Sequence, residues 1–374
     1  MPKIRARYLA SQVVKDLKKK MVFVSGPRQV GKTTLSQSLI KKTGGEYLNW
    51  DNAAHRKQIL KNQWPLEGLL VLDEIHKYRS WRNTLKGLYD VHKNAVKILV
   101  TGSARLDHYR RGGDSLQGRY HMLRLHPLSV AELKLKTTEQ INTLINLSGF
   151  PEPYFSRSAT GALRWSEEYR QRLIYDDVRD LEKIVDLAKL ELLMFKIPEL
   201  VGSTLSINSL REDLDVSHKA ITHWLMILEK LCYIYRIPPF QSKKLRALKK
   251  EQKAYLYDWS LPENKGSRFE NLVAGHLLKW VHYRQDVYGE RYGLNYFRDV
   301  DKREVDFIIT YRDKPVKAVE CKLSDNNISP TLNYFKTKYP ETDALQVCLQ
   351  PKNEYANNLG VKLVSAVRFL SELI

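Results

Sequence analysis

A glycine-rich segment near the N-terminus has the residue types and the spacing of a loop that binds nucleotide phosphates. It matches the pattern G-x-x-x-x-G-K-[ST] and comprises Gly26, Pro27, Arg28, Gln29, Val30, Gly31, Lys32, Thr33 and Thr34. Glycines let the backbone wrap around phosphates, so that loop N–H groups and the start of the next helix face the anion. The pattern predicts that Lys32 reaches the β- and γ-phosphates of ATP and that the Thr33 hydroxyl binds Mg²⁺.

A second apolar run, Leu69–Leu72, ends in the two carboxylates Asp73 and Glu74. In a phosphate-binding site an acid at the end of such a strand holds Mg²⁺ through water, and we assign this role to Asp73. Glu74 can polarise the attacking water as a general base, which favours a hydrolase over a small-molecule kinase. The alternative is that Glu74 only begins a helix, where the helix dipole favours an acid.

Three further side chains are candidates for contact with the γ-phosphate. Thr101 and Ser103 follow the apolar run Lys97–Thr101 and can sense the phosphate or the water; otherwise they form a strand-end turn. Arg119 can neutralise the γ-phosphate, from its own subunit or from a neighbour's, or it pairs with a surface carboxylate. We expect Arg28 to support neighbouring loops rather than to catalyse.

The segments around these motifs predict a parallel sheet covered by helices. Nearly continuous apolar runs are typical of strands buried on both faces, and they occur at Met21–Val24, Glu46–Trp50, Leu69–Leu72, Lys97–Thr101 and Tyr120–Leu125. The phosphate-binding motif lies between the first of these runs and the helical stretch Thr34–Lys42, which is the strand–loop–helix setting it requires. The fold class is therefore α/β.

Four segments together carry a resemblance to a known family. They are Gly26–Thr34 (GPRQVGKTT), Leu72–Ile75 (LDEI), Thr101–Ser103 (TGS) and Gly118–Ser129 (GRYHMLRLHPLS). The chain resembles, over essentially its whole length, the prokaryotic AAA+-like ATPases that carry a C-terminal domain of unknown function related to restriction endonucleases. The resemblance implies an additional-strand P-loop fold, ATP hydrolysis and a DNA-linked or regulatory role.

The middle of the chain has the pattern of a helix, a turn and a second helix. The first helix is predicted over Ile207–Leu214 and the second over His218–Leu231, with Ser217 as its N-cap. The apolar residues of the second helix fall on one face, which leaves His218 and Lys219 facing outward near its start. The strand-like segment 233–238 and the basic segment 241–250 can form a wing after these helices. Together the two helices and the wing predict a winged-helix domain, which either binds DNA or only packs between other domains.

Near the C-terminus a second group of chemically capable residues comprises Glu270, Asp306, Glu320 and Lys322. The turn at 312–315 predicts a hairpin that sets Asp306 opposite Glu320, and the two-residue period of a strand puts Glu320 and Lys322 on one face. Two carboxylates and a lysine in this arrangement can hold Mg²⁺ and activate water against a phosphodiester. This is the D…ExK signature of restriction-endonuclease-like nucleases, with Asp306 and Glu320 as metal ligands. Such folds also persist as binding modules, so cleavage stays an open question.

The amino-acid composition indicates which class of partner the chain binds. The 374 residues include 62 Lys+Arg against 42 Asp+Glu, a net charge of +20, and the sequence pI is about 9.6. This excess favours a polyanionic partner, with nucleic acid (DNA above RNA) before an anionic membrane surface. The three cysteines are widely spaced and odd in number, which excludes a disulfide framework and favours the cytoplasm. No run approaches the ~20 apolar residues that cross a bilayer.

We therefore expect three domains: a P-loop ATPase domain (1–136), a helical and winged-helix region (137–260) and a restriction-endonuclease-like domain (261–374). The main hypothesis is an ATPase that engages DNA, with cleavage by the second site under nucleotide control left open. A homo-oligomer is the expected assembly. The competing hypothesis is a nucleotide-dependent switch or scaffold whose C-terminal domain binds a partner without cleavage.

Overall fold

The computed structural model describes residues 7–103, 106, 116–178, 186–240, 251–324 and 327–374. The chain divides into two compact units, Met1–Pro127 and Leu128–Ile374, which we call the N-terminal and the C-terminal unit. Among the described residues, none of the helices combines the length and the apolar character that a membrane span needs.

The N-terminal unit is built on a five-stranded sheet in the order β2-β3-β4-β1-β5, and every neighbouring pair is parallel. Its strands are β1 (Met21–Ser25), β2 (Glu46–Asn49), β3 (Gly68–Asp73), β4 (Val96–Thr101) and β5 (Tyr120–Arg124). The predicted parallel sheet is confirmed. Because β4 lies between β1 and β3, the sheet has the additional strand that the resemblance implies.

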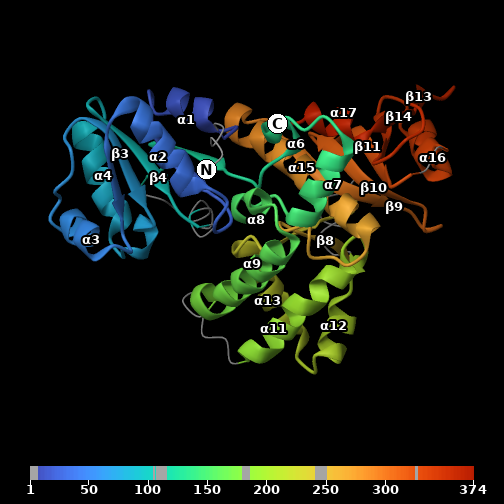
Figure 1. Ribbon diagram of the computed structural model, residues 1–374, viewed down its shortest axis with the longest axis horizontal. Coiled ribbons are helices and arrows are strands. Elements are labelled where there is room, and N and C mark those ends of the chain that lie inside the picture. Colours follow the sequence, from blue (N-terminus) through green and yellow to red (C-terminus); the bar gives the residue numbers. More distant parts are fainter. Residues whose placement is uncertain (1–6, 104–105, 107–115, 179–185, 241–250, 325–326) are drawn as a thin grey trace. The chain divides into compact units, whose positions relative to one another are not determined.

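Helices cover both faces of this sheet (Figure 1), with α1 and α2 on one side and α3 and α4 on the other. The helical segments are α1 (Ala10–Asp16), α2 (Lys32–Thr43), α3 (Ala53–Leu60), η1 (Ile75–Lys77) and α4 (Trp81–His92). Trp81 and Leu85 of α4 pack with Phe23 of β1 and Leu72 of β3 in one hydrophobic core. The rigid sheet thereby holds the loops that follow the carboxyl ends of its strands.

The C-terminal unit begins with a helical region. Its helices are α6 (Val130–Leu133), α7 (Thr138–Leu147), α8 (Pro151–Ser156), α9 (Ala159–Arg172), the π-helical η3 (Leu173–Val178), α11 (Leu187–Lys196), the 3₁₀ segment η4 (Ile197–Leu200), α12 (Ile207–Asp213) and α13 (His218–Lys230). A small antiparallel sheet joins them in the order β6-β8-β7, formed by β6 (Thr204–Leu205), β7 (Ile234–Ile237) and β8 (Gln252–Leu256).

The predicted helix–turn–helix corresponds to α12 and α13. The Ser217 hydroxyl accepts a hydrogen bond from Ala220 N at 3.1 Å, as its predicted N-cap role requires. Trp224 is among the buried apolar residues of α13, while His218 and Lys219 are exposed. The basic segment 241–250, which we expected to form the wing, lies outside the described residues.

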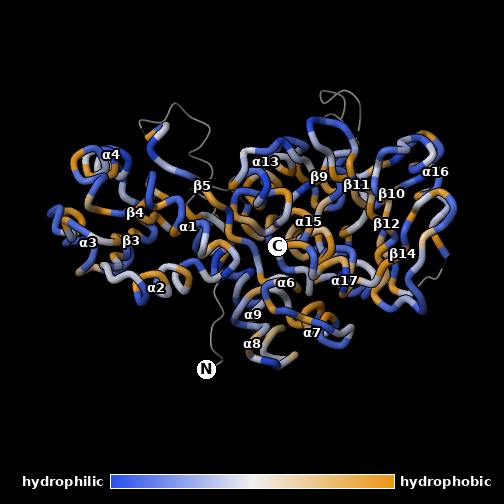
Figure 2. The backbone as a smooth tube through the Cα atoms, turned by 90° about the horizontal axis from the view of Figure 1, so that it is seen from above, coloured by the Kyte–Doolittle hydropathy of each residue, from blue (hydrophilic) through white to orange (hydrophobic). Residues whose placement is uncertain are grey.

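The rest of the C-terminal unit is a long helix and a six-stranded sheet in the order β13-β14-β12-β11-β10-β9. Its elements are α15 (Lys265–Tyr288), β9 (Tyr292–Arg298), β10 (Glu304–Tyr311), β11 (Lys314–Lys322), α16 (Pro330–Lys338), β12 (Asp343–Cys348), β13 (Tyr355–Ala356), β14 (Lys362–Ser365) and α17 (Ala366–Ser371). The helix and the central strands carry hydrophobic stretches (Figure 2), and α15 packs against β8 to β11. The predicted β10–β11 hairpin is present, with a tight turn at Arg312 and Asp313, both at positive φ.

Candidate nucleotide-binding site

The predicted phosphate-binding loop connects β1 to α2 in a conformation that needs its glycines. Gly26 has a φ of +151°, and a Cβ at this position would lie 2.3 Å from the carbonyl oxygen of Leu125, so no other residue fits there. Gly31, at a φ of 100°, is the N-cap of α2. The first turn of α2 therefore presents its N–H groups at the loop, where an anion is favoured.

Lys32 lies folded over this loop. Its ammonium donates to the carbonyl oxygens of Gly26 at 3.0 Å and Pro27 at 2.6 Å, and the side chain is buried. The positive charge is thus already held beside the backbone that would surround the phosphates. This position matches the contact with the β- and γ-phosphates that the motif predicts.

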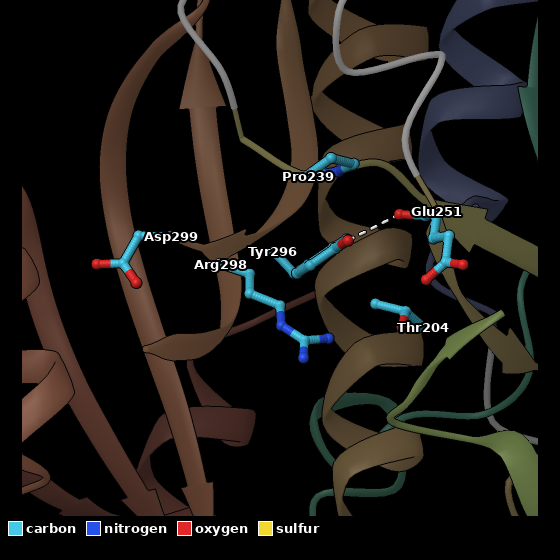
Figure 3. A pocket seen from close by; sticks show the side chains of 6 residues that line it. All are labelled: Thr204, Pro239, Glu251, Tyr296, Arg298 and Asp299. Carbon is cyan, nitrogen blue, oxygen red and sulfur yellow. Dashed lines mark hydrogen bonds between the residues drawn. The ribbon is translucent and has the colours of Figure 1, made fainter. Parts of the chain in front are cut away.

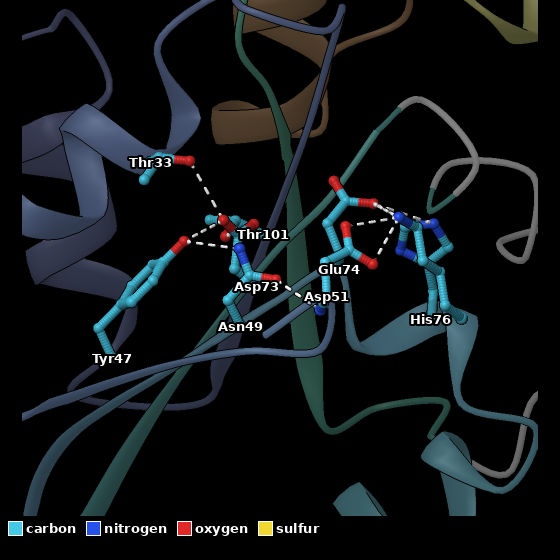
Figure 4. Close-up of polar contacts among 9 residues, drawn as sticks. Thr33, Tyr47, Asn49, Asp51, Asp73, Glu74, His76 and Thr101 are labelled. Atoms are coloured by element: carbon cyan, nitrogen blue, oxygen red, sulfur yellow. Dashed lines mark hydrogen bonds and ion pairs between the residues drawn. The ribbon is translucent and has the colours of Figure 1, made fainter. Parts of the chain in front are cut away.

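Asp73, at the end of β3, is the centre of a hydrogen-bond network (Figure 4). Its Oδ2 accepts from Thr33 Oγ1 at 3.1 Å and also from Tyr47 Oη, while its Oδ1 accepts from Thr101 Oγ1 at 2.6 Å. The structure therefore brings together the two residues expected at a Mg²⁺ ion. A hydroxyl and a carboxylate facing each other fit this ion, because Mg²⁺ prefers hard oxygen ligands.

The two residues proposed as γ-phosphate sensors occupy different surroundings. The Thr101 hydroxyl is committed to Asp73, so Thr101 positions the carboxylate. Ser103 is buried two residues beyond the end of β4. A contact between Ser103 and the γ-phosphate stays a prediction.

Glu74 lies next to Asp73 at the same edge of the sheet. Its backbone is in the left-handed region (φ 56°, ψ 19°), and its N–H donates to Thr101 O at 2.8 Å. Strained conformations of non-glycine residues concentrate at functional sites. Its carboxylate approaches His76 Nε2 at 3.5 Å and Lys77 Nζ at 3.9 Å. Burial raises the pKa of the Glu74 carboxyl, although the positive charge of Lys32 acts in the opposite direction. A carboxylate with a raised pKa is suited to act as a general base.

Arg119 lies at the opposite end of the sheet strands, which corrects the expectation that it contacts the γ-phosphate of its own subunit. Its carbonyl oxygen accepts from Met21 N, so Arg119 is level with the start of β1, whereas the phosphate-binding loop follows the end of this strand. The separation along β1 is about 16 Å, more than an arginine side chain spans. Its guanidinium instead forms two hydrogen bonds with the exposed Asp90, at 2.8 and 3.1 Å.

Sequence analysis missed two residues of this site. The buried Arg7 guanidinium donates to the carbonyl oxygens of Val30, in the loop, and His126, after β5. Tyr47 of β2 donates to Asp73. Neither residue belongs to a phosphate-binding motif, and each acts by holding a motif residue in place.

In the C-terminal unit the hairpin brings Asp306 and Glu320 onto neighbouring strands. They are each one residue beyond the paired Phe307 and Val319. The Asp306 carboxylate crosses to β11, where its Oδ2 accepts from the backbone N–H of Cys321 at 2.8 Å. This agrees with the facing positions that the sequence predicts.

The other two predicted members lie on the same side. Lys322 Nζ is 3.1 Å from Glu320 Oε1, and Glu270 Oε1 on α15 accepts from Tyr255 Oη at 2.7 Å. Burial, followed by the charge of Asp306, raises the pKa of Glu270 to about 7 and that of Glu320 to about 8. Glu320 Oε2 is buried and has no hydrogen-bond partner in the part of the chain that the structure describes.

Two further residues of this cluster were not predicted. Lys253 of β8 is fully buried, and Glu304 at the start of β10 is 2.5 Å from its ammonium. Lys253 follows soon after the basic segment 241–250, and a lysine in this setting is expected in solvent. Its burial could therefore not be predicted from the sequence. Within the described ranges, no group of three or more His, Cys, Asp or Glu side chains is arranged to hold a metal ion.

Comparison with known proteins assigns the first part of the chain. Residues 18–134 match a family model described as an AAA domain. The N-terminal segment is therefore similar to AAA-type domains. Residues 138–264 and 265–368 match two further models, each described as a domain of unknown function.

Curated relatives are distant. An uncharacterized protein of Mycobacterium tuberculosis is 23% identical over 244 residues, which cover 64% of this chain and 55% of that protein. An uncharacterized protein of Methanocaldococcus jannaschii is 26% identical over 292 residues, covering 63% of this chain and 61% of that protein. The match thus spans little more than half the length of these relatives.

Solved structures give only weak likenesses. The Bacteroides Pif1 helicase bound to single-stranded DNA has a TM-score of 0.23 at 16% identity, covering 43% of this chain and 49% of that one. A signal-transduction ATPase with numerous domains and a tetratricopeptide-repeat sensor, from Pyrococcus horikoshii, has a TM-score of 0.24 at 12% identity, covering 75% and 47%. TM-scores this low do not define a shared fold for the whole chain.

Proposed function

We propose that this chain binds ATP with Mg²⁺, hydrolyses it, and engages nucleic acid. The observation that carries the proposal is the placement of Glu74 directly after Asp73, whose carboxylate meets Thr33 of the phosphate-binding loop at 3.1 Å. A site that only binds nucleotide needs no buried carboxylate beside the metal position, whereas hydrolysis needs a base for the attacking water.

The residues have distinct roles in this proposal. Lys32 exchanges its contacts with Gly26 and Pro27 for phosphate oxygens and offsets their charge. Thr33 and Asp73 hold Mg²⁺, which when bound neutralises charge on the phosphates. Glu74, whose burial raises its pKa, accepts the proton of the attacking water. The loop residues 26–34 otherwise orient the phosphates through backbone N–H groups.

Nucleic acid is the proposed partner because of charge and element order. The chain carries a net charge of +20. The succession α11, β6, α12, α13, β7, β8 is that expected of a winged helix, with His218 and Lys219 exposed at the start of α13. The basic segment 241–250 connects β7 to β8 in the sequence, where a winged helix has its wing. DNA is the expected form, and the cytoplasm the expected location.

For residues 261–374 we propose a restriction-endonuclease-like fold that serves binding. The facing Asp306 and Glu320 support the fold, and the buried Lys253 among the carboxylates favours binding over cleavage. The competing function is a nucleotide-dependent switch or scaffold. In this case the ATP site is the same, but the C-terminal region binds a protein and the chain does not bind nucleic acid.

The experiment is the steady-state ATPase rate of the full chain with and without duplex and single-stranded DNA at low salt. The proposal predicts slow turnover that DNA raises several-fold. Turnover with no DNA binding would favour the scaffold. A chain that neither binds nor hydrolyses ATP would overturn the proposal as a whole.

A further inference from the structure

A buried ammonium lies within the acidic cluster of the C-terminal unit. The side chain of Lys253 on β8 is fully buried. Its Nζ is 2.5 Å from Glu304 Oε1, 3.7 Å from Glu270 Oε1 and 4.0 Å from Asp306 Oδ1. The three carboxylates belong to two elements, α15 and β10, so a single cation joins the helix to the sheet.

This lysine stays charged in spite of its burial. Removing an ammonium from water is costly unless carboxylates surround it. Burial lowers the pKa of Lys253, but the charges of Glu270, Asp306 and Glu304 outweigh this effect, and the pKa lies above its usual value. The face of the Tyr296 ring, 5.5 Å from Nζ, adds a further favourable contact.

The ammonium of Lys253 lies among carboxylate oxygens that a divalent metal would need. The oxygens of Asp306 and Glu270 nearest to Nζ are Oδ1 and Oε1, and Asp306 Oδ2 is held by the backbone N–H of Cys321. A Mg²⁺ ion requires oxygen ligands at about 2.1 Å. An ion bound by these carboxylates would lie against the ammonium, and two positive charges would repel each other in a buried site.

A cavity lies close to the acidic cluster. Its volume is about 330 Å³, and Figure 3 shows the residues that line it: Thr204, Pro239, Glu251, Tyr296, Arg298 and Asp299. The ring of Tyr296 is the one that lies 5.5 Å from Lys253 Nζ. Arg298 Nε lies 3.8 Å from Glu304 Oε2, so Glu304 connects the cavity to Lys253 through its two oxygens.

We propose that Lys253 is the resident cation of this acidic site, where it takes the place of a divalent metal between Glu270, Glu304 and Asp306. The C-terminal unit then binds its partner without metal-dependent cleavage. Among the described residues, no three of these carboxylates are arranged around a metal while the ammonium is present, but its removal leaves their charge uncompensated, and Glu320 Oε2 is buried without a hydrogen-bond partner in the same part of the chain. We therefore expect a divalent ion to enter when the ammonium is removed, with Glu320 among its ligands. The inference concerns residues outside the ATP site and does not depend on ATP hydrolysis.

The test measures Mn²⁺ binding to the full chain without nucleotide, by the loss of the free-ion signal in electron paramagnetic resonance. Wild type is compared with Glu320→Gln and Asp306→Asn, since any Mn²⁺ held by this site disappears in those two variants. We expect the three chains to bind the same amount. Lys253→Met should gain one Mn²⁺ per chain, and Glu320→Gln added to it should remove that ion.

Lys362→Met is the matched control, because Lys362 is an exposed lysine paired with Asp343 and should gain no ion. Mn²⁺ bound to wild type and lost in both Glu320→Gln and Asp306→Asn would overturn the proposal. A folded Lys253→Met chain that gains no Glu320-dependent ion would overturn it as well. If Lys253→Met does not fold, the amounts of Mn²⁺ bound by wild type, Glu320→Gln and Asp306→Asn are by themselves sufficient to support or overturn the proposal.

Discussion

The phenol of Tyr47 donates a hydrogen bond to Oδ2 of Asp73, the same oxygen that accepts from Thr33 at 3.1 Å. Burial, with the contact to Asp73, raises the pKa of Tyr47, so this hydroxyl keeps its proton and remains a donor at neutral pH. A residue on β2 thus fixes the orientation of the carboxylate that we assign to Mg²⁺. Tyr47 is a positioning residue, since it acts through Asp73.

Tyr47→Phe should raise the Mg²⁺ concentration that half-saturates ATP turnover by about tenfold, because a lost hydrogen bond to a charged group is worth roughly 1.5–3 kcal/mol. The measurement is ATPase rate against Mg²⁺ at saturating nucleotide. Tyr89→Phe is the control, since the Tyr89 hydroxyl donates to the carbonyl oxygen of Lys19 at 3.4 Å, before the start of β1 and away from the phosphate-binding loop. A lower melting temperature with an unchanged Mg²⁺ requirement would mean that Tyr47 is merely structural.

Arg119→Ala should leave the turnover per chain in dilute solution unchanged within about twofold. Arg119 pairs with the exposed Asp90 at the far end of the sheet, out of reach of a nucleotide in the same chain. The measurement is turnover across a range of protein concentrations, with Asp90→Ala as the matched control. Loss of turnover that appears only in Arg119→Ala, and only at high concentration, would reveal a role in a neighbouring subunit.

Nucleic-acid binding should fall linearly in log affinity against log salt, because each neutralised phosphate regains its counterions. Reversing the charge of Lys243, Lys244, Lys249 and Lys250 should flatten this slope, whereas the same change at four scattered lysines elsewhere should alter it less. Fluorescence anisotropy with a labelled duplex gives both slopes. The absence of DNA and RNA binding at about 50 mM salt would favour the protein scaffold.

His276 makes the C-terminal unit sensitive to acid. Its Nε2 accepts from Val130 N at 3.0 Å and its Nδ1 faces Leu272 O at 2.8 Å, so the buried ring must be neutral. Burial lowers its pKa to about 4, below the 6.5 of the unfolded chain. As the pH falls from 7 to 4, the histidine is protonated in the unfolded chain before it is protonated in the folded one. The free energy of unfolding therefore decreases by about 3 kcal/mol.

Urea unfolding at several pH values checks this prediction. His276→Gln keeps one acceptor and one donor but cannot be protonated in this range. It should therefore lose less stability than wild type between pH 7 and pH 4. Equal pH dependence of the two chains would show that the ring is not the group responsible.

The sequence predicted what depends on local pattern. The five strands of the N-terminal sheet are recognisable because each is a nearly continuous apolar run, and the Ser217 cap follows from its position before a helical face. The pairing of Asp306 with Glu320 follows from a short turn between two strands.

Contacts between residues far apart in the chain could not be predicted from the sequence. Lys253 follows a basic run, and only the fold surrounds it with the carboxylates of α15 and β10. Tyr47 meets Asp73 because β2 pairs with β3. Of the two roles considered for Arg119, the structure supports the pairing with a surface carboxylate: Arg119 directly precedes β5, and in a parallel sheet this places it at the amino ends of the strands, away from the phosphate-binding loop.

The most direct test of the central claim is ATP turnover by Glu74→Gln, measured together with its nucleotide affinity. The account predicts that Glu74→Gln binds ATP about as tightly as wild type, while turnover falls by about 10² or more, because an amide cannot accept the proton of water. Lys32→Ala, the control for binding, should lose nucleotide affinity, since the β- and γ-phosphate charge goes uncompensated. A Glu74→Gln chain that hydrolyses ATP at the wild-type rate would contradict the account.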